Sequence, residues 1–92
     1  MLALRVPPAV VSLILRHLHP QLKGKIRRGL DALVEDAAVG KALREELAGL
    51  RSYRIGRFRI VYREASGGVV EIVAIGPRRT IYQETFRLIQ RK

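Results

Sequence analysis

Cysteine and tryptophan are absent from this chain of 92 residues, and its aromatic side chains are limited to three tyrosines and two phenylalanines. The lack of cysteine excludes disulfide bonds and thiolate metal sites. Apolar residues nevertheless make up 48% of the sequence, so aliphatic side chains must fill most of a packed core. This length and composition fit one domain that spans residues 1–92.

Long hydrophobic runs are also missing. The longest, Ala9 to Leu15, is interrupted by Ser12 and is far too short to cross a bilayer. Its flanks lack a secretory cleavage pattern. Together with the absence of cysteine, this favours a cytoplasmic protein that does not bind membranes.

Residues that commonly carry enzymatic chemistry are few. The two histidines, His17 and His19, have no carboxylate at ligand spacing, so the sequence predicts no metal site. None of the serines has a nearby His/Asp arrangement that would activate a nucleophile. The glycines do not have phosphate-loop spacing. We therefore expect no cofactor.

Positive charge is what the sequence has in excess. The chain carries 18 Lys and Arg against 8 Asp and Glu, a net charge of +10. Residues 51–92 hold most of this excess, with ten basic and three acidic side chains. A basic balance of this size predicts an anionic partner that is bound mainly by the C-terminal half.

The N-terminal half predicts a short strand over Leu2–Val6, followed by two helices. Pro7 and Pro8 stop the strand and favour a helix start. Apolar residues then recur at three-to-four spacing, which predicts helices over Ala9–Leu18 and Pro20–Glu35 that form a hairpin. Residues 36–50 are expected to be a crossover connection with a helical turn around Ala42–Leu47.

From Arg51 the apolar period changes to two, which indicates strands. The turn signals Gly56-Arg57 and Gly67-Gly68 divide the segment into hairpins. The predicted elements are strands over Arg51–Ile55, Phe58–Arg63 and Val69–Ile75, and a last helix over Ile81–Gln90. The fold class is therefore α+β: a short N-terminal strand and a two-helix hairpin packed on one face of a small twisted antiparallel sheet, with a C-terminal helix. The other face of the sheet is expected to stay open.

Residues 51–63 hold five arginines and no acidic residue. Arginine presents a planar fork that matches phosphate oxygens and keeps its charge at any physiological pH. Alternation places Arg54 and Arg59 on the outer face of adjacent strands, and Arg78 follows the central strand. The alternative is that these arginines are solvated charges that discourage aggregation of an edge hairpin.

Two segments, Gly49–Arg63 and Ile75–Tyr82, resemble the RelE/ParE superfamily of type II toxin-antitoxin toxins, and the similarity extends over nearly the whole chain. For the RelE branch the resemblance implies an mRNA interferase, an endoribonuclease that cuts messenger RNA in the ribosomal 30S A site. The ribose 2′-hydroxyl attacks the adjacent phosphate without a metal or cofactor. The implied partners are a cognate antitoxin, the ribosome and mRNA.

Carried over by motif, Arg59 steadies the phosphorane, Arg78 serves the leaving group and Tyr82 orients the attacking hydroxyl. Arg54 falls where the family often has lysine, and it completes the predicted catalytic set. The predicted substrate-binding residues are Arg51, Arg57, Arg63 and Arg79. Two other functions remain open: a ParE-like inhibitor of DNA gyrase, which needs no catalytic cluster, and a non-catalytic RNA-binding protein.

Overall fold

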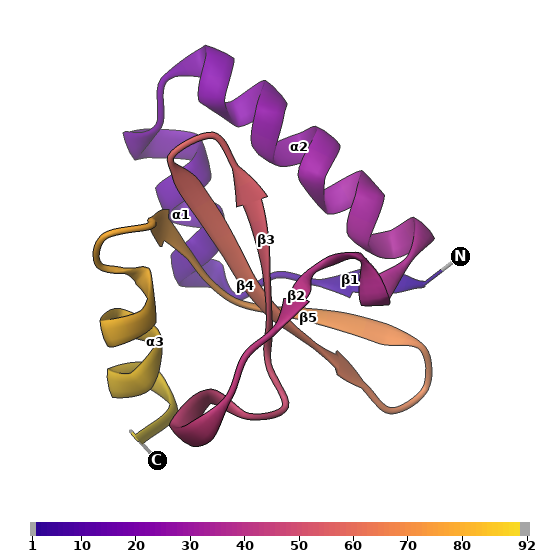
Figure 1. The fold of residues 1–92 in the computed structure, drawn as a ribbon. Helices are drawn as coiled ribbons and strands as arrows, with labels where there is room; N and C mark the ends of the chain where they lie inside the picture. The colour runs from indigo at the N-terminus through magenta and orange to yellow at the C-terminus, as the bar shows by residue number, and fades with distance from the viewer. Residues whose placement is uncertain (1, 91–92) are drawn as a thin grey trace.

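A five-stranded sheet with helices on both faces makes up the fold, as a computed structural model that describes residues 2–90 shows (Figure 1). The strands lie in the order β1-β5-β4-β3-β2. The elements are β1 (Ala3–Arg5), α1 (Pro8–His17), α2 (Pro20–Glu35), η1 (Ala37–Val39), β2 (Lys41–Ala42), η2 (Glu45–Leu47), β3 (Arg51–Ile55), β4 (Phe58–Ala65), β5 (Val69–Pro77) and α3 (Ile81–Gln90). Among residues 2–90, no helix has the length and apolar character needed to cross a membrane.

The predicted α+β class is confirmed, but the sheet is mixed rather than antiparallel. Strands β3, β4 and β5 form the two predicted antiparallel hairpins. The N-terminal strand β1 pairs in parallel with β5, with Ala3 opposite Val69 and Arg5 opposite Glu71. The direction of β1 depends on the path of the chain through α1 and α2, which the periodicity of single elements does not report.

Helices α1 and α2 begin where proline favours a helix start. Pro8 and Pro20 occupy the first turn of each helix, where a missing N–H costs no hydrogen bond. The His19 Nδ1 atom accepts the N–H of Gln21 at 3.2 Å and caps α2. Both helices cover one face of the sheet, and their apolar stripes enclose the main core. Its fully buried members include Ile26, Leu33, Ile60, Tyr62 and Ile72.

The opposite face is covered in part by α3, so the expectation that it stays open was wrong (Figure 1). A second, smaller core forms there from Leu50, Val61, Ala74 and Ile81. Val61 and Tyr62 are neighbours in β4, and because successive side chains of a strand point to opposite faces, they pack into different cores. The two cores leave one end of this face free for polar side chains.

Residues 36–50 contain more structure than the predicted crossover with one helical turn. Two short 3₁₀ turns, η1 and η2, flank the two-residue strand β2, which pairs with the start of β3. Gly40 allows a close approach, because a Cβ there would clash with the Tyr62 hydroxyl oxygen. The Tyr62 hydroxyl accepts the N–H of Gly40 at 2.9 Å and donates to the Ala37 carbonyl at 2.7 Å. The connection is thereby fixed to the main core.

Candidate functional site

A cavity of about 290 Å³ opens on the α3 face of the sheet, and we call it the central cavity. It is bounded by β4, by the start of α3 and by the connection that contains β2 and η2. No acidic residue lines it. The lining residues are Lys41, Leu43, Arg44, Leu47, Arg59, Arg78 and Tyr82. Four cations around one open cavity form a site suited to a multiply charged anion.

Ser52 connects two of these side chains. Its hydroxyl lies 3.1 Å from the Tyr82 hydroxyl, and it accepts Nη1 of Arg59 at 3.3 Å. Ser52 is only 2% exposed, so its position is set by the sheet rather than by solvent. It therefore fixes the tips of Arg59 and Tyr82 relative to each other.

The Arg59 guanidinium is held in a partly buried position with its hydrogen bonds incomplete. Its Nε is buried and has no hydrogen-bond partner among residues 2–90. On the neighbouring strands Arg59 lies opposite Arg54 and Gly76, neither of which can neutralise it. A cation in this position gains most from an anionic ligand.

Backbone contacts determine where Arg78 lies. Its N–H donates to the carbonyl of Arg57 at 2.8 Å, which ties the end of β5 to the turn between β3 and β4. Thr80 then donates its N–H to the Pro77 carbonyl at 3.1 Å, and the chain turns into α3 one residue later. Arg78 and Tyr82 thus lie on either side of this turn and line the same cavity.

Arg54 is separate from the other three predicted catalytic residues. Although it lies opposite Arg59 in the β3–β4 register, its side chain is exposed and does not line the central cavity. Its Nε donates to the carbonyl of Gly56 at 3.3 Å. The structure thus brings Arg59, Arg78 and Tyr82 together and leaves Arg54 beside a neighbouring cavity.

That neighbouring cavity, of about 320 Å³, lies where the β3–β4 turn meets the loop after β5, and we call it the hairpin-tip cavity. It contains two of the predicted substrate-binding residues, Arg57 and Arg79. The complete lining is Arg54, Gly56, Arg57, Phe58, Pro77, Arg78 and Arg79. Arg78 lines both cavities, so the two form one continuous basic region.

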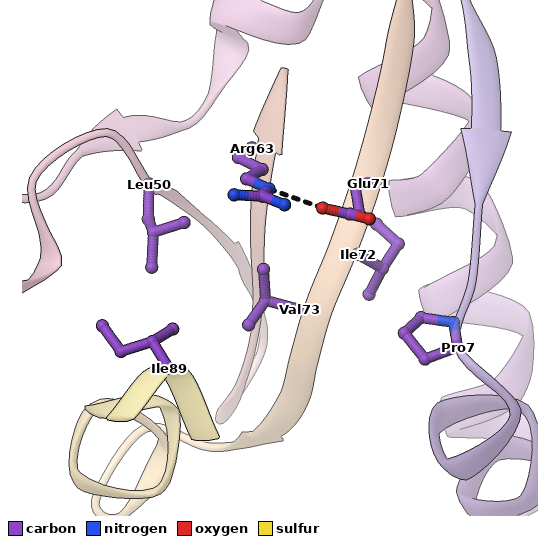
Figure 2. A pocket seen from close by; sticks show the side chains of 7 residues that line it. All are labelled: Pro7, Leu50, Arg63, Glu71, Ile72, Val73 and Ile89. Atoms are coloured by element: carbon purple, nitrogen blue, oxygen red, sulfur yellow. Dashed lines mark hydrogen bonds and ion pairs between the residues drawn. The ribbon is translucent and has the colours of Figure 1, made fainter. Parts of the chain in front are cut away.

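The other two predicted substrate-binding residues have contacts within the protein. Arg51 donates from Nη1 to the carbonyl of Gly40 at 2.8 Å and, less closely, to that of Ala38 at 3.4 Å. Arg63 forms an ion pair with Glu71, which also pairs with Arg5 at 3.2 Å. Figure 2 shows Arg63 and Glu71 at the edge of an apolar pocket whose lining includes Leu50, Val73 and Ile89. None of these residues lines the central cavity. Neither arginine joins the basic region.

The charges around Glu71 also affect its titration. The hydrogen bond from Arg63 lowers the pKa of the Glu71 carboxyl below its ordinary value, and the hydrogen bond from Arg5 acts in the same direction. Glu71 therefore remains ionised and neutralises part of the charge of both arginines. This is the ion-paired end of the α3 face.

Three polar residues of the central site, Lys41, Arg44 and Ser52, were not identified from the sequence. Ser52 shares its strand face with Arg54, so the alternation pattern contained a signal for it. Lys41 and Arg44 gave no such signal, because their position depends on the pairing of β2 with β3.

Within the described part of the chain, no three His, Asp or Glu side chains are grouped as metal ligands. The predicted absence of a metal site stays a prediction, because the side chain of His17 lies outside the described residues.

Comparison with known families matches residues 13–82 to the ParE toxins of type II toxin-antitoxin systems, parDE. No match was found among curated proteins. The toxin-antitoxin complex RelBE2 from Mycobacterium tuberculosis contains a chain with 28% identity and a TM-score of 0.73, and the match covers 84% of this chain and 98% of that one. A mutant of the Escherichia coli toxin RelE in the free state has a TM-score of 0.76 at 16% identity, with coverages of 98% and 96%. A YoeB-YefM complex from Staphylococcus aureus matches at 0.66 and 19%, with coverages of 82% and 94%.

Proposed function

The chain belongs to the ParE toxin family of type II toxin-antitoxin systems, within the RelE/ParE superfamily, and from this premise we propose that it is a ribosome-dependent endoribonuclease that cuts mRNA. One observation carries the proposal: Arg59, Arg78 and Tyr82 line a single open cavity together with Lys41 and Arg44, and no acid lines it. Ser52 holds both the Tyr82 hydroxyl and Nη1 of Arg59, so the cavity presents a positioned hydroxyl beside a positioned cation, as a displacement at phosphorus requires.

The proposed reaction is an internal displacement at phosphorus. The 2′-oxygen of a ribose forms a bond to the adjacent phosphorus while the bond to the 5′-oxygen of the next nucleotide breaks. The products are a 2′,3′-cyclic phosphate and a 5′-hydroxyl end. Because the phosphorane between them is dianionic, catalysis depends on fixed cations that face its equatorial oxygens.

Arg59 is assigned to those oxygens. Ser52 holds its Nη1, and its partly buried guanidinium has no acidic neighbour across the sheet. A cation that is already in place does not have to reorganise as charge develops, so its stabilisation of the transition state is larger than that of a mobile side chain.

Arg78 is assigned to the leaving oxygen and Tyr82 to the attacking hydroxyl. Arg78 lies at the turn before α3, on the opposite side of that turn from Tyr82. The Tyr82 hydroxyl is hydrogen-bonded to the Ser52 hydroxyl at 3.1 Å, and this bond orients it in the cavity that Arg59 also lines. Together with Arg59, these side chains align the attacking 2′-oxygen with the phosphorus and stabilise the charge that develops on the phosphorane and on the leaving 5′-oxygen.

Lys41 is the side chain of this cavity that suits proton transfer. The 2′-hydroxyl must lose a proton and the 5′-oxygen must gain one. Arginine effectively cannot act as a base, whereas lysine is able to exchange its proton. We assign this exchange to Lys41 rather than to Arg54, which does not line the central cavity and instead helps to attract RNA.

The partners of the proposed enzyme follow from its charge and from its relatives. The substrate is mRNA in the 30S A site, which places the protein in the cytoplasm. A chain with a net charge of +10 is suited to an antitoxin whose docking segment is acidic and covers the basic region. The related structures of RelBE2 and of YoeB-YefM are complexes of a toxin with its antitoxin, which supports this partner.

A second function is suggested by the family to which the chain belongs. The matched toxins are ParE toxins, and a ParE-like inhibitor of DNA gyrase would use the same fold without a catalytic cluster. For such a protein, Arg59, Arg78 and Tyr82 would be three among many surface contacts. In a non-catalytic RNA-binding protein, too, these three residues would be ordinary contacts to the ligand.

Primer extension on mRNA with programmed ribosomes separates these functions. The wild type is expected to produce breaks confined to the A-site codon, and Arg78→Ala is expected to abolish them. Arg27→Ala is the matched control, because it removes an exposed arginine of α2 that lines none of the cavities described above. Breaks that persist in Arg78→Ala would contradict the assignment of the leaving-group residue. Gyrase-dependent DNA breaks with intact mRNA would replace the nuclease with the gyrase inhibitor.

A further inference from the structure

The hairpin-tip cavity lies next to the proposed catalytic site and has a distinct composition. Four arginines surround it, and no acidic residue lines it. All four are exposed, and they extend from different segments, namely Arg54 from β3, Arg57 from the turn, and Arg78 and Arg79 from the loop after β5. Such a ring of guanidinium groups favours an anion that enters from solvent.

Between the arginines, the cavity is floored by apolar groups. Phe58 and Pro77 lie directly opposite each other across β4 and β5, and both line the cavity. Phe58 is half-buried, with one part packed against the main core and the rest available to the cavity. A small flat apolar group is therefore suited to lie on this floor.

The cavity is also preformed. The hydrogen bond from the Arg78 N–H to the Arg57 carbonyl joins its two walls at 2.8 Å, and the strand pairing of Phe58 with Pro77 fixes its base. Its volume of about 320 Å³ lies at the lower end of the range for ligand pockets, roughly 300–1,000 Å³. It therefore suits one planar ring with its sugar rather than a folded segment of protein.

From these features we infer that the hairpin-tip cavity binds one nucleotide of an RNA strand, adjacent to the nucleotide that is cut. Its base stacks on Phe58 and Pro77, between guanidinium planes, and its phosphate contacts Arg57 and Arg79. The inference rests on the proposed function, because Arg78 belongs to both cavities and would link this nucleotide to the scissile phosphate. Phe58 is then the residue on which this base stacks.

Fluorescence anisotropy with short RNA tests this site independently of cleavage. The probes are labelled five-nucleotide RNAs with 2′-O-methyl riboses, which cannot undergo 2′-hydroxyl attack. In one series a single abasic site is moved along the strand. Wild type is expected to bind the probe with the abasic site at one particular position about tenfold more weakly than the complete probe, as stacking of one base predicts.

Phe58→Leu tests the floor of the cavity. Leucine keeps apolar volume for the core but lacks a flat face, so the complete probe should bind about tenfold more weakly and the penalty at the sensitive position should disappear. The unfolding midpoint of the variant, measured alongside, shows whether the domain remains folded. An unchanged penalty in a folded Phe58→Leu protein would overturn the inference.

A second pair of variants keeps the test valid if Phe58→Leu fails to fold. Arg57→Glu and Arg27→Glu change the net charge equally, and both residues are exposed. Only Arg57→Glu should reduce the penalty at the sensitive position. Equal effects of the two variants would reduce the cavity to part of a general basic surface and overturn the inference.

The remaining outcomes also discriminate. The nucleotide site would be refuted if the abasic site weakened binding equally at every position. It would also be refuted if the wild type did not bind the complete probe measurably. If a labelled acidic peptide then binds to the wild type and Arg57→Glu prevents that binding, the occupant of the hairpin-tip cavity is a protein segment. Failure of the proposed nuclease has a different result, namely intact mRNA on programmed ribosomes together with a normal abasic scan.

Discussion

Two arginine-bearing regions lie on the same face of the sheet and differ in what stands across from them. At one end Arg63 and Arg5 lie on the strands that flank Glu71, and both form ion pairs with it. At the other end Arg59 lies between Arg54 and Gly76. One acidic residue in β5, Glu71, thus decides which arginines are partly neutralised and which remain available to a ligand.

The comparison also shows why a count of arginines overstates the binding surface. Of the five in residues 51–63, Arg63 is ion-paired and Arg51 is bonded to backbone carbonyls. Arg54, Arg57 and Arg59 are not paired with an acid in the described chain. With Arg78, Arg79, Lys41 and Arg44 they form the basic region of the two cavities.

The largest expected difference between the two ends is in cleavage. Arg59→Ala should reduce the rate of A-site mRNA cleavage by about 100-fold or more, because a preplaced charge at the phosphorane is lost. Arg63→Ala removes the same charge at the ion-paired end and should leave the rate nearly unchanged. Single-turnover cleavage on programmed ribosomes measures both. Equal losses would mean that total charge, rather than placement, drives the reaction.

A second comparison concerns two tyrosines on opposite faces. Tyr82→Phe removes the hydroxyl that contacts Ser52 and should slow cleavage by about tenfold or more, with little change in stability. Tyr62→Phe removes a buried hydroxyl that is bonded to Gly40 and Ala37, and should cost roughly 1–3 kcal/mol of unfolding free energy with cleavage preserved. Urea unfolding and the cleavage assay, applied to both variants, test whether Tyr82→Phe mainly affects cleavage and Tyr62→Phe mainly affects stability.

The smallest expected effect is the pH dependence of the ion-paired end. The folded-state pKa of Glu71 lies below its ordinary value of 4.5, mainly through the hydrogen bond from Arg63. Its contribution is therefore fully present above 4.5 and is lost as pH falls through the lowered value. Glu71→Gln should make the protein slightly less stable near neutral pH, and the difference from wild type should shrink in acid.

Thermal unfolding of both proteins across that pH range provides the measurement. The neutral-pH difference should stay within about 1 kcal/mol, because the arginine partners are largely exposed. A stability gap that widened as the pH fell would contradict the direction of the shift. The same variant frees Arg5 and Arg63, so it should also bind the RNA probes more tightly at low salt.

The sequence by itself determined the strongly periodic elements. The ranges predicted for α2, β3 and α3 are those of the structure, because each has a periodic apolar pattern bounded by clear signals, such as Pro20 at the start of α2 and Gly56 after the end of β3. The motifs also indicated the family and the three side chains Arg59, Arg78 and Tyr82, which the structure places around one cavity.

Only the tertiary structure decided the parallel pairing of β1, the position of α3 on the second face and the presence of Lys41 and Arg44 in the central cavity. It also decided which arginines are paired with Glu71. The physical reason is that these features depend on strand register and chain path between residues far apart in sequence. Local periodicity specifies which face a side chain occupies but not which neighbour stands across from it.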